Sequence, residues 1–143
     1  MRGVVKEMLS QEANEEEKNI SVLKRIKNIL IFIFFLFIEV LIALFVHDSF
    51  IRPYVGDVLV VFVIYFFVRI MIPEKCKWLP MFIFLFAVGV EIGQYFHIAE
   101  KLGISDNIFM KILIGSTFDM KDIICYGVGS LILQMFVWVK VRR

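Results

Sequence analysis

Several carboxylates stand inside or at the start of otherwise apolar runs, and they are the side chains best suited to chemistry. Asp119 and Asp122 lie three residues apart before the last apolar run. Asp57 opens an earlier run, and Glu91 and Gln94 lie inside the run between these two. Such carboxylates can bind a cation, share a proton or act as a general acid or base. Which of these they do depends on the elements that position them.

The composition indicates that those elements are membrane helices. Of the 143 residues, 60% are hydrophobic, and the mean hydropathy is +0.83. A soluble domain has about 45–50% apolar residues. The net charge is +2 and the basic residues are scattered, which argues against a nucleic-acid partner. We therefore expect an all-α membrane protein whose main partner is the lipid bilayer.

Four apolar runs predict four transmembrane helices packed as a compact bundle, because a helix crosses a bilayer with about 20 apolar residues and irregular backbone cannot face lipid. The expected spans are about 29–46, 55–72, 79–98 and 122–139. Residues 29–143 would form this domain. We expect residues 1–28 to be a polar, mobile cytoplasmic segment with room for one short surface helix.

The Lys and Arg residues near the span ends predict the orientation. Nine lie on one side: Lys24, Arg25, Lys27, Arg69, Lys75, Lys77, Lys140, Arg142 and Arg143. Four lie on the other: Arg52, Lys101, Lys111 and Lys121. We therefore expect both termini in the cytoplasm, with the Arg69 side chain extending to the cytoplasmic membrane surface.

This orientation gathers the unusual polar residues at the outer side, where we expect a shared pocket. Its members would be Arg52, Asp57, Glu91, Gln94, Asp119, Asp122 and Tyr126. An acid inside a span costs about 2.5–3.5 kcal/mol even on a lenient scale. Glu91 should therefore face the bundle, either protonated or paired, with Arg52 as its cationic partner or Gln94 as its hydrogen-bonding partner. Glu39 carries the same cost, and the sequence identifies no partner for it.

On the fourth span one helical face combines acids with small and polar residues. It consists of Asp119, Asp122, Tyr126, Gly129 and Ser130. The alternative is that the aspartates only cap helix starts, where they complement the exposed amides and the helix dipole. Capping does not explain Glu91.

Gly89 and Gly93 form a G-x-x-x-G pair on the third span, nearly opposite the face that carries Glu91. Small residues at this spacing let another helix approach closely. They predict a packing face, either against a neighbouring helix or in a homodimer.

The carboxylates at positions 57, 91, 119 and 122 could supply oxygen ligands to Mg²⁺ or Ca²⁺. The sequence has neither a D-x-D-x-D loop nor an H-E-x-x-H motif. We therefore expect no metal site and no cofactor.

Three motifs also carry a family resemblance. They are R-x-Y-x-G-D before the second span, E-x-x-Q in the third, and G-x-x-F-x-x-x-D-x-x-x-Y-x-x-G at the fourth. Together they resemble an uncharacterised bacterial family of small multi-pass membrane proteins, which is similar to the VanZ-like group. The resemblance covers about residues 50–131 and implies a place in the bacterial cytoplasmic membrane. The motif residues are Arg52, Tyr54, Gly56, Asp57, Glu91, Gln94, Gly115, Phe118, Asp122, Tyr126 and Gly129.

The sequence also departs from the pattern of these families. Lys111 stands where an Arg is expected, and Tyr126 occupies a region where the VanZ-like group usually has Asn. A drug-resistance role is therefore not transferred. The resembled family has no settled activity to carry over.

Three functions fit the expected pocket. The leading one is a cell-envelope binding or accessory protein that engages a cationic or polar group on a small ligand or a lipid-linked envelope precursor. The second is an enzyme with Glu91 or Asp122 as acid or base, with or without Mg²⁺, although no G-x-S-x-G motif supports it. The third is a proton-coupled transporter with Glu91 as its site.

Overall fold

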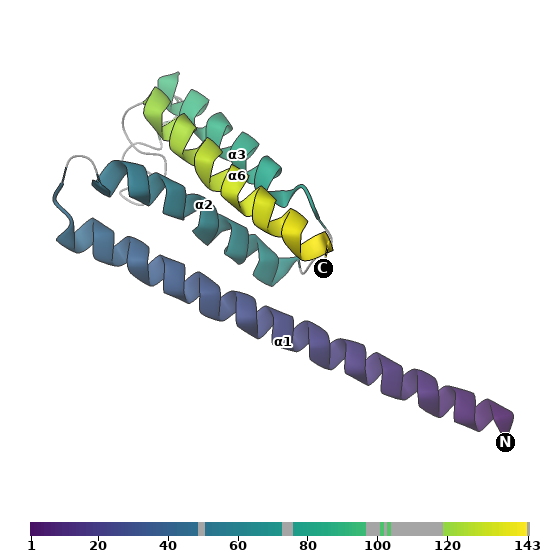
Figure 1. Ribbon diagram of the computed structural model, residues 1–143. Helices are drawn as coiled ribbons and strands as arrows, with labels where there is room; N and C mark the ends of the chain where they lie inside the picture. Colours follow the sequence, from purple (N-terminus) through teal and green to yellow (C-terminus); the bar gives the residue numbers. More distant parts are fainter. Residues whose placement is uncertain (49–50, 73–75, 97–100, 102, 104–118, 143) are drawn as a thin grey trace.

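The described residues form an all-helical bundle, as the sequence predicts (Figure 1). The computed structural model describes residues 1–48, 51–72, 76–96, 101, 103 and 119–142. Its helices are α1 (Arg2–Phe45), α2 (Ile51–Met71), α3 (Leu79–Tyr95) and α6 (Met120–Arg142).

Three of these helices, α1, α2 and α6, are long and apolar enough to cross a membrane. The third apolar helix, α3, has 17 residues and is shorter than the other three. Three candidate membrane spans thus agree with the expectation of transmembrane helices, and the chain is treated below as a membrane protein. The fourth span and the cytoplasmic position of the termini stay predictions.

The polar N-terminal residues continue the first apolar helix instead of forming a separate segment. α1 is 44 residues long, or about 65 Å at 1.5 Å per residue. Its N-terminal half extends beyond the ends of the other helices (Figure 1). The expectation of at most one short helix in residues 1–28 is therefore wrong, because this stretch contains neither Pro nor a turn signal that would end the helix.

α1 packs against α2 through aromatic rings. The ring centroid of Phe35 lies 5.2 Å from that of Phe62 and 5.8 Å from that of Phe66. The ring centroids of Phe32 and Phe67 are 5.7 Å apart. No residue of α1 is buried. Ile31, Ile38 and Ile42 are half-buried. Apart from these, Phe32 and Phe35, the Leu, Ile and Phe side chains of α1 are exposed, as expected for a helix that lipid surrounds.

α2, α3 and α6 pack together and bury one stripe each. The α2 stripe runs at four-residue spacing through Val61, Tyr65 and Arg69, and the α3 stripe includes Ile83 and Ala87. Side chains three or four residues apart share one helix face. On α6 the buried residues are Cys125, Gly129, Ser130, Leu133 and Val137.

Gly129 is the glycine at which two helices approach most closely. A Cβ on Gly129 would lie 3.1 Å from the Val58 carbonyl oxygen and 3.3 Å from the Val61 Cβ. Gly89 is exposed, and a Cβ there would meet nothing within 4 Å. The prediction that a neighbouring helix of the same chain packs closely against Gly89 is therefore wrong. The homodimer through Gly89 and Gly93 stays a prediction.

Candidate functional site

Each of the four described helices carries a carboxylate near the same end of the bundle. Glu39 lies one turn beyond Phe35 on α1, and Asp57 one turn before Val61 on α2. Glu91 ends the buried stripe of α3, and Asp122 lies in the first turn of α6. Because successive helices run in opposite directions, these positions meet at one end of the bundle (Figure 1). We call this end, with its carboxylates at 39, 57, 91, 119 and 122, the acidic end.

Asp57 and Asp122 are in direct contact at the acidic end. Their carboxyl groups lie within hydrogen-bonding distance of each other across the interface of α2 and α6. Two carboxyl groups can hydrogen-bond to each other only when one of them carries a proton. Such a pair can share one proton, and Glu39 and Glu91 lie close enough to interact with Asp57 electrostatically.

Glu91 is almost completely buried, with 1% of its surface exposed. Its Oε1 accepts a hydrogen bond from the backbone N–H of Asp119, at 2.9 Å. The expected partner was the guanidinium of Arg52, and the structure gives Glu91 a backbone donor instead. This bond ties the end of α3 to the residue that precedes α6.

Asp119 acts as the helix cap that the alternative interpretation describes. Its Oδ1 accepts a hydrogen bond from the Lys121 N–H at 3.0 Å, and its carbonyl oxygen accepts one from the Asp122 N–H at 3.1 Å. Side-chain acceptors at this position satisfy amides that have no partner inside the helix. Asp57 differs, because it lies in the second turn of α2, beyond the first-turn amides. The capping interpretation thus fits Asp119, and Asp122 complements the dipole in the first turn of α6, but Asp57 is not explained in this way.

Glu39 lies at the acidic end, although no partner for it could be identified from the sequence. Its carboxylate lies over Gly56, where an added Cβ would be 3.4 Å from Oε1. Its other oxygen, Oε2, is buried and has no hydrogen-bond partner among the described residues. Glu39 shares a helix face with Phe35 and Asn28, which lie four and eleven residues before it. This spacing was the available signal that Glu39 faces another helix.

A pocket of about 280 Å³ opens between α1 and α2 at the acidic end. Glu39, Asp57 and Arg52 supply its charged groups. Arg52 itself is exposed, so the pocket combines two carboxylates with a guanidinium near its mouth. Such a site can hold a group that carries a positive charge beside a negative one.

The remaining expected members are placed less centrally. Tyr126 is half-buried and packs against the core formed around Val61 and Leu133. Gln94 is half-buried near the end of α3. The motif residues Gly115 and Phe118 lie outside the described residues.

In the part of the chain that the structure describes, no three His, Cys, Asp or Glu side chains are arranged to hold a metal ion. At the acidic end, Asp57 thus contacts Asp122, Glu91 accepts a backbone hydrogen bond, and Glu39 lines an open pocket.

Comparison with known proteins identifies the family but no activity. Residues 46–130, more than half of the chain, match the model of a family described as protein of unknown function, DUF2809. No curated protein and no solved structure matches the chain. The match covers all three motifs and confirms an uncharacterised family, whereas the likeness to the VanZ-like group stays a prediction. The chain therefore belongs to the DUF2809 family of proteins of unknown function.

Proposed function

We propose that this protein binds, at its acidic end, the head group of a lipid or lipid-linked envelope molecule that carries a positively charged amine. In this role it is a membrane binding or accessory protein. Glu39 and Asp57 would hold the amine, and Arg52 would hold a neighbouring anionic group.

The observation that carries this proposal is the unpartnered oxygen of Glu39. Its Oε2 is buried and lacks a donor among the described residues, beside a pocket of about 280 Å³ that Asp57 and Arg52 also line. A buried charged oxygen without a hydrogen bond is costly, and more so in a membrane span. An ammonium group supplies both the missing donor and the compensating charge.

The position of the pocket favours a lipid-borne ligand. It lies between two helices that are long and apolar enough to cross a membrane. A molecule with acyl chains can reach such a pocket from the bilayer, with its head group at the polar end. Asp57, which lines the pocket, also contacts Asp122 of α6. The buried Glu91 of α3 lies nearby.

Native mass spectrometry of the full chain tests the proposal with two lipids of identical acyl chains. Phosphatidylethanolamine offers N–H donors to the carboxylates, whereas phosphatidylcholine does not. We expect preferential retention of phosphatidylethanolamine. Glu39→Gln should weaken it by about tenfold or more, since a hydrogen bond to a charged group contributes about 1.5–3 kcal/mol.

The matched control is Glu16→Gln, which removes the same charge from an exposed position on α1. Retention should be unchanged in this variant. Equal retention of both lipids by the parent protein would reject the proposal, as would undiminished phosphatidylethanolamine binding in Glu39→Gln.

Proton-coupled transport is the second candidate, favoured by the hydrogen bond between Asp57 and Asp122. A pair that holds one proton can release and regain it as the site is occupied or emptied. Vesicles that contain the protein and a pH-sensitive dye test this candidate. It predicts proton flux that Asp57→Asn abolishes, and flux no greater than in empty vesicles would remove it.

A further inference from the structure

The opposite end of the bundle carries the reverse charge. Five cations line a pocket of about 300 Å³ there: Lys24, Lys27, Arg69, Lys77 and Lys140. They come from α1, α2, α6 and the residues just before α3. The described residues that line this pocket include no Asp or Glu. We call it the basic pocket.

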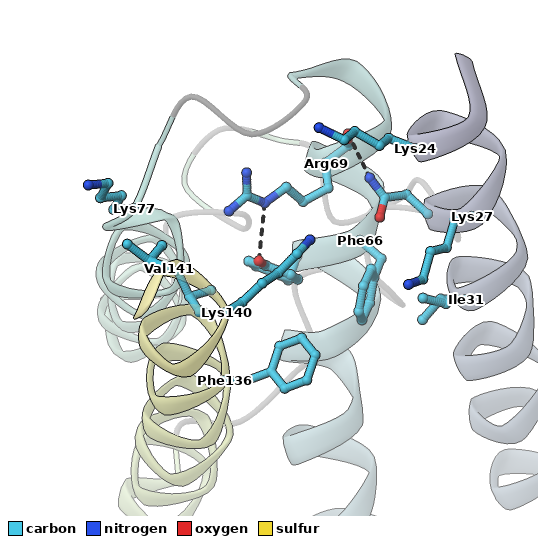
Figure 2. Close-up of a pocket in the computed structure, with 12 residues that line it drawn as sticks. Lys24, Lys27, Ile31, Phe66, Arg69, Lys77, Phe136, Lys140 and Val141 are labelled. Carbon is cyan, nitrogen blue, oxygen red and sulfur yellow. Dashed lines mark hydrogen bonds between the residues drawn. The ribbon is translucent and has the colours of Figure 1, made fainter. Parts of the chain in front are cut away.

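Figure 2 shows how the helices contribute. Lys24, Lys27 and Ile31 stand on α1, Lys140 and Val141 on α6, and Arg69 lies on α2 between them. Several separate elements must therefore pack correctly to bring the positive charges together.

Arg69 is buried against the protein, with 8% of its surface exposed. The expectation that its side chain extends to the cytoplasmic membrane surface stays a prediction. Its Nε donates a hydrogen bond to the Tyr65 hydroxyl at 3.1 Å, and one terminal nitrogen donates to the Cys76 carbonyl at 3.3 Å. The guanidinium thereby pins the end of α2 to the connection that leads into α3.

The other terminal nitrogen of Arg69 is buried and has no hydrogen-bond partner among the described residues. A buried cationic N–H without an acceptor is costly. Because Arg69 lines the basic pocket, an anionic oxygen bound there would supply the missing acceptor. A planar guanidinium is well suited to bind phosphate oxygens.

We propose that the basic pocket binds a phosphate group, and specifically that of a phospholipid with a negatively charged head group. Phe66, Phe136 and Val137 give the pocket apolar walls beside its cations, and these suit the first carbons of acyl chains. Basic pockets between membrane helices bind anionic head groups in this way. The site is separate from the acidic end, and its occupancy does not depend on the proposed function.

Lipid titrations of the full chain in detergent, read by native mass spectrometry, test this site. The probes are phosphatidylglycerol and phosphatidylcholine of identical acyl chains, which differ in net charge, with inorganic phosphate as a soluble competitor. The parent protein should retain phosphatidylglycerol in preference. The double variant K24Q/K27Q should weaken that retention by about tenfold, because each removed lysine weakens attraction to anionic lipid.

The matched control is K6Q/K18Q, which removes two lysines from exposed positions on the same helix, outside the pocket. These α1 pairs are better tests than substitution of Arg69, whose hydrogen bonds also hold the fold. K6Q/K18Q should retain phosphatidylglycerol as the parent does.

The outcomes separate the two sources of phosphate. Retention of phosphatidylglycerol that inorganic phosphate does not displace supports the lipid head group. Binding and displacement by inorganic phosphate alone would overturn the lipid assignment and make the site one for free phosphate. Equal retention of both lipids, or equal losses in K24Q/K27Q and K6Q/K18Q, would overturn the site altogether.

Discussion

The two ends of the bundle treat charge in opposite ways. At the acidic end, carboxyl groups from four helices gather near one another, and those of Asp57 and Asp122 lie within hydrogen-bonding distance. At the basic end, cations surround a buried arginine that is held by neutral oxygens of Tyr65 and Cys76.

Each end nevertheless leaves one buried charged atom without a partner among the described residues, Glu39 Oε2 at one and an Arg69 nitrogen at the other. The difference teaches that the ligands proposed for the two ends must differ in sign, with a cationic group at the acidic end and an anionic group at the basic end.

The largest expected effect comes from separating α2 and α6, because both ends depend on their contact. Gly129→Leu should lower the free energy of unfolding by about 3 kcal/mol, since its side chain would meet the fixed Val58 carbonyl oxygen. Gly89→Leu is the control, because its surroundings are open. Unfolding in mixed micelles, followed by circular dichroism, measures both. Equal losses in the two variants would contradict the close approach at Gly129.

A smaller effect is expected from removing the acceptor at Glu91. Glu91→Leu should lower the free energy of unfolding by about 2 kcal/mol, because the Asp119 N–H loses its hydrogen bond. Glu91→Gln keeps an acceptor oxygen of the same reach and should stay near the parent value. The same unfolding measurement separates them. If Gln is as damaging as Leu, the charge of Glu91 matters more than the hydrogen bond.

At the basic end, Arg69→Lys should lower the free energy of unfolding by about 1 kcal/mol. Lysine keeps the charge but cannot reach both the Tyr65 hydroxyl and the Cys76 carbonyl. Arg52→Lys, at the exposed end of the same helix, should change stability by less than about 0.5 kcal/mol. A comparable loss at both positions would show that the two arginines do not differ as the structure indicates.

The smallest effect at neutral pH is expected from Asp57→Asn, within about 0.5 kcal/mol. The amide can donate a hydrogen bond to Asp122 without a shared proton. Unfolding in mixed micelles, followed by circular dichroism, measures the difference between this variant and the parent. A loss of stability well beyond that range would contradict the replacement of one hydrogen-bonded pair by another.

Local patterns predicted much of the fold. The apolar runs marked the membrane helices, and the cost of an acid in a span correctly indicated that Glu91 is buried. The polar start of the chain was harder to interpret, because charged residues in a helix that extends beyond the bundle look like those of a surface segment. The three motifs pointed to an uncharacterised family, which the family match confirms.

Pairings between helices were beyond such patterns. The spacing of Gly89 and Gly93 suggested a close contact, yet a Cβ on Gly89 would meet nothing within 4 Å, whereas a Cβ on Gly129 would lie 3.1 Å from the Val58 carbonyl oxygen of α2. Arg52 was expected to pair with Glu91, whereas Asp119 donates to Glu91 and Arg52 lines the pocket with Glu39.

The sequence by itself determined that this chain forms apolar helices, that they suit a bilayer, and that acids within them must avoid lipid. Hydropathy and helical periodicity are properties of a single segment, so they can be read locally. Only the tertiary structure decided that Glu39 faces Gly56 and that Arg69 is buried beside Tyr65. Such choices depend on which helix faces meet, and that is settled by the simultaneous packing of all the helices rather than by any one of them.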